Sequence, residues 1–247
     1  MVSADADATT ERTVLLTGAA GGLGRVLAER FVAGGDRVVA VDRDAAGLDD
    51  LASRLGVTTV VADVSSADDV DAAVATAGPV DVMVNNAAVV DRLGSVHEVD
   101  PDEWHRLIAI NLTAPFLFCR AVLPGMIERG SGIIVNVASI AGLRGGRAGA
   151  AYTASKHGLV GLTTNIAATT GHLGIRSNTV CPGSIDTGMQ VLGEVFASGR
   201  ESLARDRRKP PAVAPGTIAD VVLFLASAEA AGLNGVALPA DSGSLAY

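Results

Sequence analysis

Aromatic residues are scarce in this chain and make up only 3% of its 247 residues. Valine, leucine, isoleucine and alanine must therefore fill the core, and 49% hydrophobic with 19% charged residues is typical of a globular protein. Basic residues are also in the minority, since 19 Lys and Arg stand against 27 Asp and Glu. The net charge of -8 argues against a nucleic-acid-binding protein, which usually carries a basic patch.

Only two cysteines are present, Cys119 and Cys181, and both fall within apolar stretches. They predict buried free thiols rather than a disulfide scaffold. No Cys and His spacing typical of a metal site occurs. The first ten residues lack the basic and apolar regions of a signal peptide, and no uninterrupted apolar run of about 18 residues predicts a membrane span. We therefore expect a cytoplasmic protein with no metal, no membrane and no nucleic-acid partner.

Short apolar strands alternate with helical segments from residue 13 onward. Strands that are apolar on both faces, separated by helices, are typical of a parallel sheet covered on both sides. Right-handed crossovers in such a sheet give a doubly wound α/β fold. We expect strands at residues 13–16, 37–41, 57–62, 81–84, 133–138, 176–181 and 236–238. We expect helices at residues 22–34, 45–55, 67–77, 100–129, 150–173 and 218–226.

The domain organisation is expected to be simple. Residues 1–12 are polar and predict a disordered N-terminal tail. Residues 13–247 contain no linker, repeat or low-complexity block, so they predict a single Rossmann-type domain with a mostly seven-stranded parallel sheet. Within it, residues 184–214 carry several glycines and predict a lid over the substrate. Pro115 is expected to kink the helix at residues 100–129.

A glycine-rich turn at residues 17–24 joins the first expected strand to the first expected helix. Gly18, Gly22 and Gly24 tolerate positive φ angles and let a ligand approach the backbone closely. The N–H groups and the dipole at the start of the helix attract phosphate. The spacing is not the general G-x-G-x-x-G fingerprint, so a plain glycine-rich turn is the alternative interpretation.

Asp42 ends the second expected strand. An acid at this position accepts hydrogen bonds from the adenosine ribose hydroxyls and repels a 2′-phosphate. The alternative is a helix N-cap, a role that Asp44 can fill instead. Arg43 is an ambiguous neighbour, because an arginine can serve a 2′-phosphate. We therefore expect NAD as the cofactor in preference to NADP.

Tyr152 and Lys156 lie four residues apart, on one face of an expected helix. A free tyrosine titrates near ~10 and is a poor base at neutral pH, but a nearby ammonium favours the phenolate. A tyrosine with such a lowered pKa can act as a general acid or base on a carbinol oxygen. Ser139 ends the fifth expected strand, where ligands meet parallel sheets. Taken alone, the pair is better explained as a surface tyrosine beside a solvated lysine.

Together these residues resemble the short-chain dehydrogenase/reductase family, over nearly the whole chain from Thr13 to about Gly243. Ser139 precedes Tyr152 by thirteen residues, as in that family. The family's catalytic tetrad matches Asn111, Ser139, Tyr152 and Lys156. The resemblance implies cofactor contacts by Gly18, Gly22, Leu23, Gly24, Asp42, Asp63, Val64, Asn85, Ala87, Tyr152, Lys156, Pro182, Gly183, Ile185 and Thr187. Two departures are Ala88, where the family usually has glycine, and Ser242 in place of the first glycine of its Asp-Gly-Gly segment.

The resemblance also implies a role for each member of the tetrad. Tyr152 exchanges the proton with the substrate oxygen, and Ser139 hydrogen-bonds that oxygen. Lys156 lowers the pKa of Tyr152 and holds the nicotinamide ribose, while Asn111 supports a water-linked proton path. We expect an NAD-dependent oxidoreductase that transfers a hydride between nicotinamide and a secondary alcohol or ketone, as an alcohol dehydrogenase or ketone reductase.

Two alternative functions remain open. An NADPH-dependent 3-oxoacyl-thioester reductase shares the tetrad, although Asp42 counts against it. A non-catalytic NAD-sensing or scaffold protein is possible on the same fold, although it need not retain the tetrad. We expect a small-molecule substrate with an apolar flank, and we expect Arg144 and Arg147 to face solvent beside an exposed glycine turn. Small residues along 150–173, together with the resemblance, predict a homotetramer.

Overall fold

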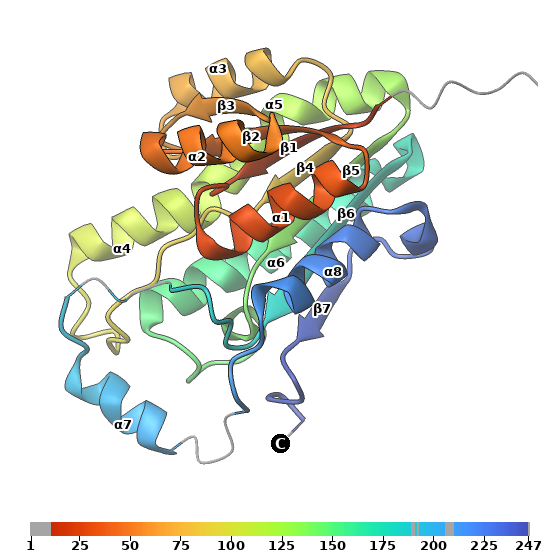
Figure 1. The fold of residues 1–247 in the computed structure, drawn as a ribbon. Coiled ribbons are helices and arrows are strands. Elements are labelled where there is room, and N and C mark those ends of the chain that lie inside the picture. The colour runs from red at the N-terminus through yellow and green to blue at the C-terminus, as the bar shows by residue number, and fades with distance from the viewer. Residues whose placement is uncertain (1–10, 189–190, 192, 206–209, 247) are drawn as a thin grey trace, which may run out of the picture.

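The computed structural model of the chain describes residues 11–188, 191, 193–205 and 210–246. Its strands are β1 (Thr13–Thr17), β2 (Arg37–Asp42), β3 (Thr58–Val61), β4 (Val82–Asn85), β5 (Gly132–Val137), β6 (Ile175–Pro182) and β7 (Ala237–Ala240). All seven pair in parallel in one sheet, in the order β3-β2-β1-β4-β5-β6-β7. The prediction of a doubly wound α/β fold with a seven-stranded parallel sheet is confirmed (Figure 1).

Helices cover both faces of this sheet. They are α1 (Gly22–Ala33), α2 (Ala45–Leu55), α3 (Ala67–Ala77), α4 (Pro101–Ile108), α5 (Ala114–Arg129), α6 (Ala150–Thr170), α7 (Ala197–Arg205) and α8 (Pro215–Leu225). One buried apolar cluster joins the sheet to α1, α2 and α8, and a second joins its other face to α3, α5 and α6. The sheet is therefore the middle of three layers, as Figure 1 shows.

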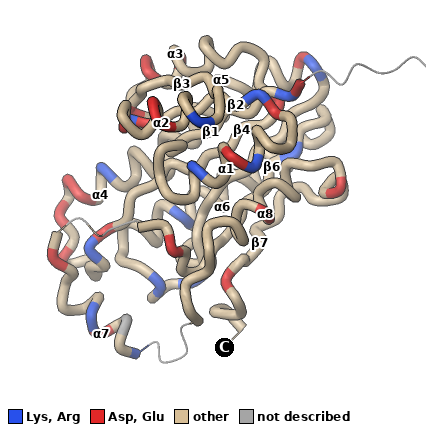
Figure 2. Tube along the Cα trace, viewed as in Figure 1, with Lys and Arg blue, Asp and Glu red and all other residues tan. Residues whose placement is uncertain are grey.

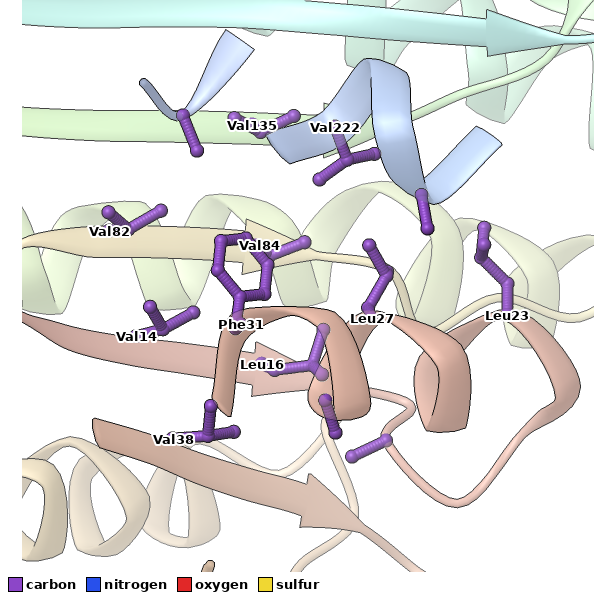
Figure 3. Packing of buried hydrophobic residues seen from close by; sticks show 14 of the residues in the cluster. Val14, Leu16, Leu23, Leu27, Phe31, Val38, Val82, Val84, Val135 and Val222 are labelled. Carbon is purple, nitrogen blue, oxygen red and sulfur yellow. The ribbon is translucent and has the colours of Figure 1, made fainter. Parts of the chain in front are cut away.

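β1 shows why an entirely apolar strand becomes the centre of the fold. Successive side chains of a strand point to opposite faces of the sheet. Val14 and Leu16 pack with Leu27 and Phe31 of α1 (Figure 3), whereas Leu15 belongs to the cluster on the other face. Both faces must be apolar because both are covered by helices.

The helix expected over residues 100–129 is interrupted. A π-helical turn at Ala109–Thr113 separates α4 from α5. Pro115 has no N–H to donate to the carbonyl of Asn111, four residues earlier, so the regular pattern fails in the turn before the proline. The irregularity predicted at Pro115 is therefore found at the turn that carries Asn111.

The combined run Pro101–Arg129 is long and apolar enough, by length and composition, to cross a membrane. In this fold 39% of its most apolar window is buried, and Phe118 and Met126 of α5 are fully buried against the sheet. The core helix of a soluble protein passes the same test, so this run does not argue for a membrane span.

Local signals set several helix ends and connections. Asp44 accepts a hydrogen bond from the Gly47 N–H and caps α2, as its position predicts. Arg12, which was assigned to the disordered tail, instead ion-pairs with Asp36 and donates to the Ala226 carbonyl. Residues 1–10 lie outside the described residues. Figure 2 shows basic and acidic residues distributed along many elements of the described chain.

Candidate active site

A cavity of about 620 Å³ lies at the carboxyl edge of the sheet. It is bordered by the ends of β1, β2, β4, β5 and β6 and by the first turns of α1 and α6. Of the residues predicted to act there, it is lined by Gly18, Gly22, Leu23, Gly24, Asp42, Asp63, Val64, Ala87, Ser139, Tyr152, Lys156, Pro182, Gly183, Ile185 and Thr187. Residues from seven separate segments of the chain thus meet in one cavity.

The glycine turn forms a cradle with bare backbone. Gly18 has a φ of 66°, and a Cβ at this position would lie 2.7 Å from the Cα of Ala87. A Cβ on Gly22 would overlap the backbone of Thr187. The N-cap of α1 is Gly21, which provides no side-chain cap, so the start of this helix is open to an anion. These residues fit the pyrophosphate of a dinucleotide cofactor.

Asp42 stands at the end of β2, beside that cradle. Its carboxylate accepts hydrogen bonds from the N–H groups of Ala20 and Asp44, each at 3.0 Å. A carboxylate can accept about four hydrogen bonds, so capacity remains for two ribose hydroxyls. Arg43 also lines the cavity but is exposed. The position suits the adenosine ribose of the cofactor.

Asp63 and Val64 line the same end of the cavity, after β3. A hydrogen bond from the Ser65 side chain, followed by one from its backbone, holds the pKa of Asp63 below its usual value. Asp63 is therefore an acceptor at neutral pH, in a place where the sequence resemblance implies a contact to the cofactor.

Ser139, Tyr152 and Lys156 come together at the other end of the cavity. Tyr152 lies in the first turn of α6 and Lys156 one turn later, with its Nζ 5.5 Å from the centre of the Tyr152 ring. Burial raises the pKa of Tyr152 to about 12, although a hydrogen bond with the Ser139 side chain opposes this increase. Burial is the largest influence on this pKa, and the expectation that Lys156 lowers it stays a prediction.

Lys156 is almost completely buried, with 1% of its surface exposed. Its Nζ donates a 2.9 Å hydrogen bond to the carbonyl of Val137, at the end of β5. Burial lowers the pKa of this amine to about 8. The side chain is thus held in the cavity wall by the sheet, beside the space where a ribose would lie.

Two predicted residues, Asn85 and Asn111, are absent from the cavity wall. Asn111 bonds both backbone groups of Val89 and donates to the Ser155 Oγ at 3.2 Å, so its side chain ties the loop after β4 to α6. Asn85 is buried beneath the sheet edge and donates to Asn136. Cofactor contact by the Asn85 side chain is therefore not supported by its position.

Sequence reasoning missed several wall residues. Asn86, rather than Asn85, lines the cavity, and its amide holds the carbonyls of Thr17 and Gly18. The alternation of side chains along β4 is the signal that separates the two asparagines. Arg147 also lines the cavity, is half-buried and donates to the Ser244 carbonyl, so the expectation that it faces solvent is wrong.

Part of the cavity wall is apolar. It contains Val89, Val90 and Leu93 from the loop after β4, and Val191 from the expected lid. The lid continues into α7, and its approach is fixed by a hydrogen bond from the Phe196 N–H to the Arg92 carbonyl. Apolar walls with a few orienting polar groups are typical of small-molecule pockets.

A parallel sheet with such a cradle and a tyrosine–lysine pair indicates the class of nicotinamide-dependent oxidoreductases. The family model for short chain dehydrogenases matches residues 12–193. The chain therefore belongs to the short-chain dehydrogenase/reductase family, whose members are oxidoreductases acting on CH–OH groups with a nicotinamide cofactor.

Characterised relatives extend along the whole chain. The 3beta-hydroxysteroid dehydrogenase 2 of Eggerthella lenta is 38% identical, covering 96% of this chain and 95% of that protein. The 2-(R)-hydroxypropyl-CoM dehydrogenase of Xanthobacter autotrophicus is 39% identical, covering 93% and 97%. A solved structure from Beutenbergia cavernae, named for an NAD(P)-dependent gluconate 5-dehydrogenase and holding NADP at low occupancy, is 32% identical. Its TM-score is 0.86 over 97% of this chain and 98% of that one.

Proposed function

We propose that this protein is an NAD-dependent dehydrogenase or ketone reductase that acts on a small or medium secondary alcohol or ketone. The observation that carries the cofactor preference is Asp42, whose carboxylate lies at the end of β2 in the cavity wall. A negative charge there favours ribose hydroxyls and repels a 2′-phosphate. Arg43 is the one competing influence at this end of the described cavity wall.

The catalytic end supports proton transfer by Tyr152. When bound, the nicotinamide ring supplies or accepts the hydride. Ser139 hydrogen-bonds the phenol and is placed to orient a substrate oxygen beside it. Because the pKa of Tyr152 is about 12 in the chain alone, the phenol is protonated at neutral pH and can donate to a ketone. Alcohol oxidation needs the phenolate, so its rate should rise with pH while reduction is favoured near neutrality.

The walls support a substrate with an apolar flank. Val89, Val90 and Leu93 line the same cavity as Tyr152 and Ser139. Arg147 adds one guanidinium to this wall, and its hydrogen bond to Ser244 holds it against the C-terminal segment. We therefore propose a neutral ketone or alcohol rather than a substrate selected by its carboxylate.

The cofactor proposal is tested by changing Asp42→Ala and measuring kcat/KM for NAD and NADP with a panel of secondary alcohols. We expect NAD efficiency to fall by roughly tenfold or more, since one ribose-binding carboxylate is lost, while NADP efficiency rises. Asp44→Ala is the matched control, because it removes a neighbouring acid that caps α2 and does not line the cavity. A wild type that already prefers NADP would contradict the proposal and point to Arg43.

The two alternative functions make different demands on the same assay. A 3-oxoacyl-thioester reductase would turn over thioester substrates with NADPH in preference to free ketones with NADH. A non-catalytic protein would bind the cofactor without oxidising or reducing any member of the panel. Ser139, Tyr152 and Lys156 meeting in one cavity wall favours catalysis over that last function.

We also propose a homotetramer, because large apolar side chains are exposed on two separate surfaces. Trp104 of α4 and Phe116 of α5 are 39% and 46% exposed, and Phe224 of α8 is 43% exposed. Two distinct self-complementary contacts build a closed tetramer with two kinds of interface. Light scattering at micromolar concentration should give the tetramer mass, and Phe116→Glu or Phe224→Glu should each give a dimer. A monomeric wild type would contradict this proposal.

A further inference from the structure

The catalytic helix α6 begins without a cap of its own. The first N–H groups of a helix have no partner within it, and a Ser, Thr, Asp or Asn side chain at the N-cap usually accepts from them. The N-cap of α6 is Gly149, which makes no side-chain hydrogen bond. The first turn, which carries Tyr152, therefore needs acceptors from elsewhere in the chain.

The loop after β4 provides these acceptors. One oxygen of Asp91 accepts from the Gly149 N–H at 3.1 Å, and the other accepts from the Tyr152 N–H at 3.0 Å. The Gly94 carbonyl accepts from the Ala150 N–H at 2.9 Å. Asp91 is 0% exposed, although aspartate is almost never fully buried unless its charge is satisfied. A carboxylate about sixty residues away in sequence thus occupies the place of an N-cap side chain.

The position of the Asp91 carboxylate depends on the absence of a side chain at Gly149. A Cβ at position 149 would overlap the Asp91 carboxylate and lie 2.7 Å from its Cγ. Any capping side chain at position 149 would therefore displace Asp91. The glycine is required here by close approach, since its φ of -75° is open to every residue.

We propose that Asp91 is a positioning residue for Tyr152. Its carboxylate holds the backbone N–H of Tyr152 and places a negative charge at the start of the catalytic helix. The proposal rests on the assignment of Tyr152 as the proton-transferring group. Asp91 does not line the cavity, so it acts through α6 and not on the substrate.

The charge of Asp91 opposes two attractions on the phenolate. The start of a helix favours a negative charge, and so does the ammonium of Lys156, which lies over the Tyr152 ring. Burial first, and then the charge of Asp91, raise the pKa of Tyr152. The other charged or titratable side chains near this end of the described cavity are Arg147 on the loop before α6 and Cys181 on β6.

Asp91 also connects α6 to the substrate side of the cavity. It accepts from the Leu93 N–H at 3.1 Å, and Leu93 lines the cavity with an unusual positive φ of 61°. The backbone carbonyl of Arg92, between Asp91 and Leu93, accepts a 3.0 Å hydrogen bond from the N–H of Phe196, just before α7. The carboxylate that holds Tyr152 therefore also holds a strained, apolar wall residue, and the residue between them contacts the expected lid through its backbone.

The electrostatic part of the proposal can be tested without substrate or cofactor. The sequence has two tyrosines, so in a Tyr247→Phe parent the phenolate absorbance reports Tyr152 alone. Rapid pH jumps, read before alkaline unfolding, give its midpoint. Asp91→Asn should lower this midpoint by about one unit, because a buried negative charge is removed. A midpoint that is unchanged or higher overturns the proposal.

Glu103→Gln is the matched control for that titration. Glu103 lies on α4 and ion-pairs with Arg92 of the loop at 2.9 Å, so this variant removes one negative charge beside the same loop while Asp91 and its bonds to α6 stay in place. Its Tyr152 midpoint should stay within a few tenths of a unit of the parent. A shift as large as that of Asp91→Asn would assign the effect to general charge and overturn a specific role for Asp91.

Gly149→Ala tests the positioning part if Asp91→Asn does not fold. This variant keeps the charge but forces the carboxylate away from the helix. Amide hydrogen exchange at Tyr152 should accelerate by roughly tenfold or more, because its N–H loses a buried partner. Exchange at the parent rate overturns the proposal, whatever the substrate turns out to be.

Turnover then links positioning to function. With an active substrate from the panel, Gly149→Ala should lower kcat by about tenfold or more and change the KM for the cofactor by less than about twofold. A rise in KM with unchanged kcat overturns the positioning role. A wild type without turnover would instead contradict the proposed function, and the titration and exchange results would still decide the role of Asp91.

Discussion

Two regions of this molecule are buried to the same extent, but one consists of apolar side chains and the other contains ionisable ones. Around α1, Leu16, Leu27 and Phe31 are 0–1% exposed and wholly apolar. At the start of α6, Asp91 and Lys156 are also 0–1% exposed, but both carry ionisable groups. Burying an apolar side chain stabilises the fold by roughly 1.5–3 kcal/mol, whereas burying a charge costs free energy unless partners compensate. The apolar region around α1 therefore stabilises the fold. The charged region at the start of α6 depends on partners that the folded chain brings to it.

The partners of the two regions differ in their sequence separation. Leu27 and Phe31 are one helical turn apart and pack on the adjacent strand β1. Asp91 reaches Gly149 and Tyr152, and Lys156 reaches Val137 on β5. Local pattern determines the first region, while the second depends on the topology that brings distant loops to one edge of the sheet.

The largest expected effect separates function from stability. Tyr152→Phe should lower kcat by roughly 10²–10⁴-fold, because only the phenol oxygen transfers the proton. The free energy of unfolding should change by less than about 1 kcal/mol, since the ring and its packing remain. Steady-state kinetics and urea denaturation measure the two quantities. Retention of more than about a tenth of kcat would remove Tyr152 from the mechanism.

The opposite change is expected in the apolar region. Phe31→Ala should lower the free energy of unfolding by roughly 3–5 kcal/mol, because Phe31 is 1% exposed and its removal leaves a cavity between α1 and β1 (Figure 3). The kcat of the molecules that remain folded should be close to that of the wild type. A loss below about 1 kcal/mol would show that this cluster can collapse around the gap, and the contrast between the regions would weaken.

The smallest expected effect is an increase in the free energy of unfolding when Lys156 of the active site is replaced. Burial lowers the pKa of Lys156 from 10.5 to about 8, so the charged amine costs about 3 kcal/mol below pH 8. Lys156→Met removes that cost and one hydrogen bond worth about 1 kcal/mol, which predicts a gain of about 2 kcal/mol near neutral pH with activity lost. Denaturation titrations of both proteins over a range of pH measure the difference.

The pH dependence gives that prediction its control. The unfolded chain binds more protons than the folded one between pH 8 and 10.5, so wild-type stability should rise with pH across this window. The Met variant should lack this particular rise. Equal pH profiles for the two proteins would contradict the assignment of the cost to Lys156.

The same contrast explains how far the sequence alone leads. The strands and most helices follow from apolar runs and their periods. Asp42 and Ser139 end or follow expected strands, and Tyr152 lies at the start of an expected helix. Asp91 has no local signature, because its partners lie about sixty residues further along the chain. Arg147 follows an exposed glycine turn, and its contact in the cavity wall with Ser244 of the C-terminal segment has no local sequence signal.

The π-helical turn shows a subtler limit. The sequence correctly marks Pro115 as a disturbance, but a missing N–H acts on the carbonyl four residues earlier. The disturbance therefore falls on Asn111, whose side chain then reaches Val89 and Ser155. A kink assigned to the proline itself misplaces the consequence by one turn.

The close contact between Gly149 and Asp91 restricts how these two positions can change during evolution. A side chain at position 149 would clash with Asp91, and the loss of Asp91 would leave the start of α6 without acceptors. Either substitution alone is therefore expected to destabilise the protein more than the two together. A descendant with Gly149→Ser and Asp91→Ala could cap α6 from within the helix. Such a lineage would release the loop that carries Leu93 and touches the lid, leaving that loop free to diversify toward new substrates while the proton-transferring helix stayed in place.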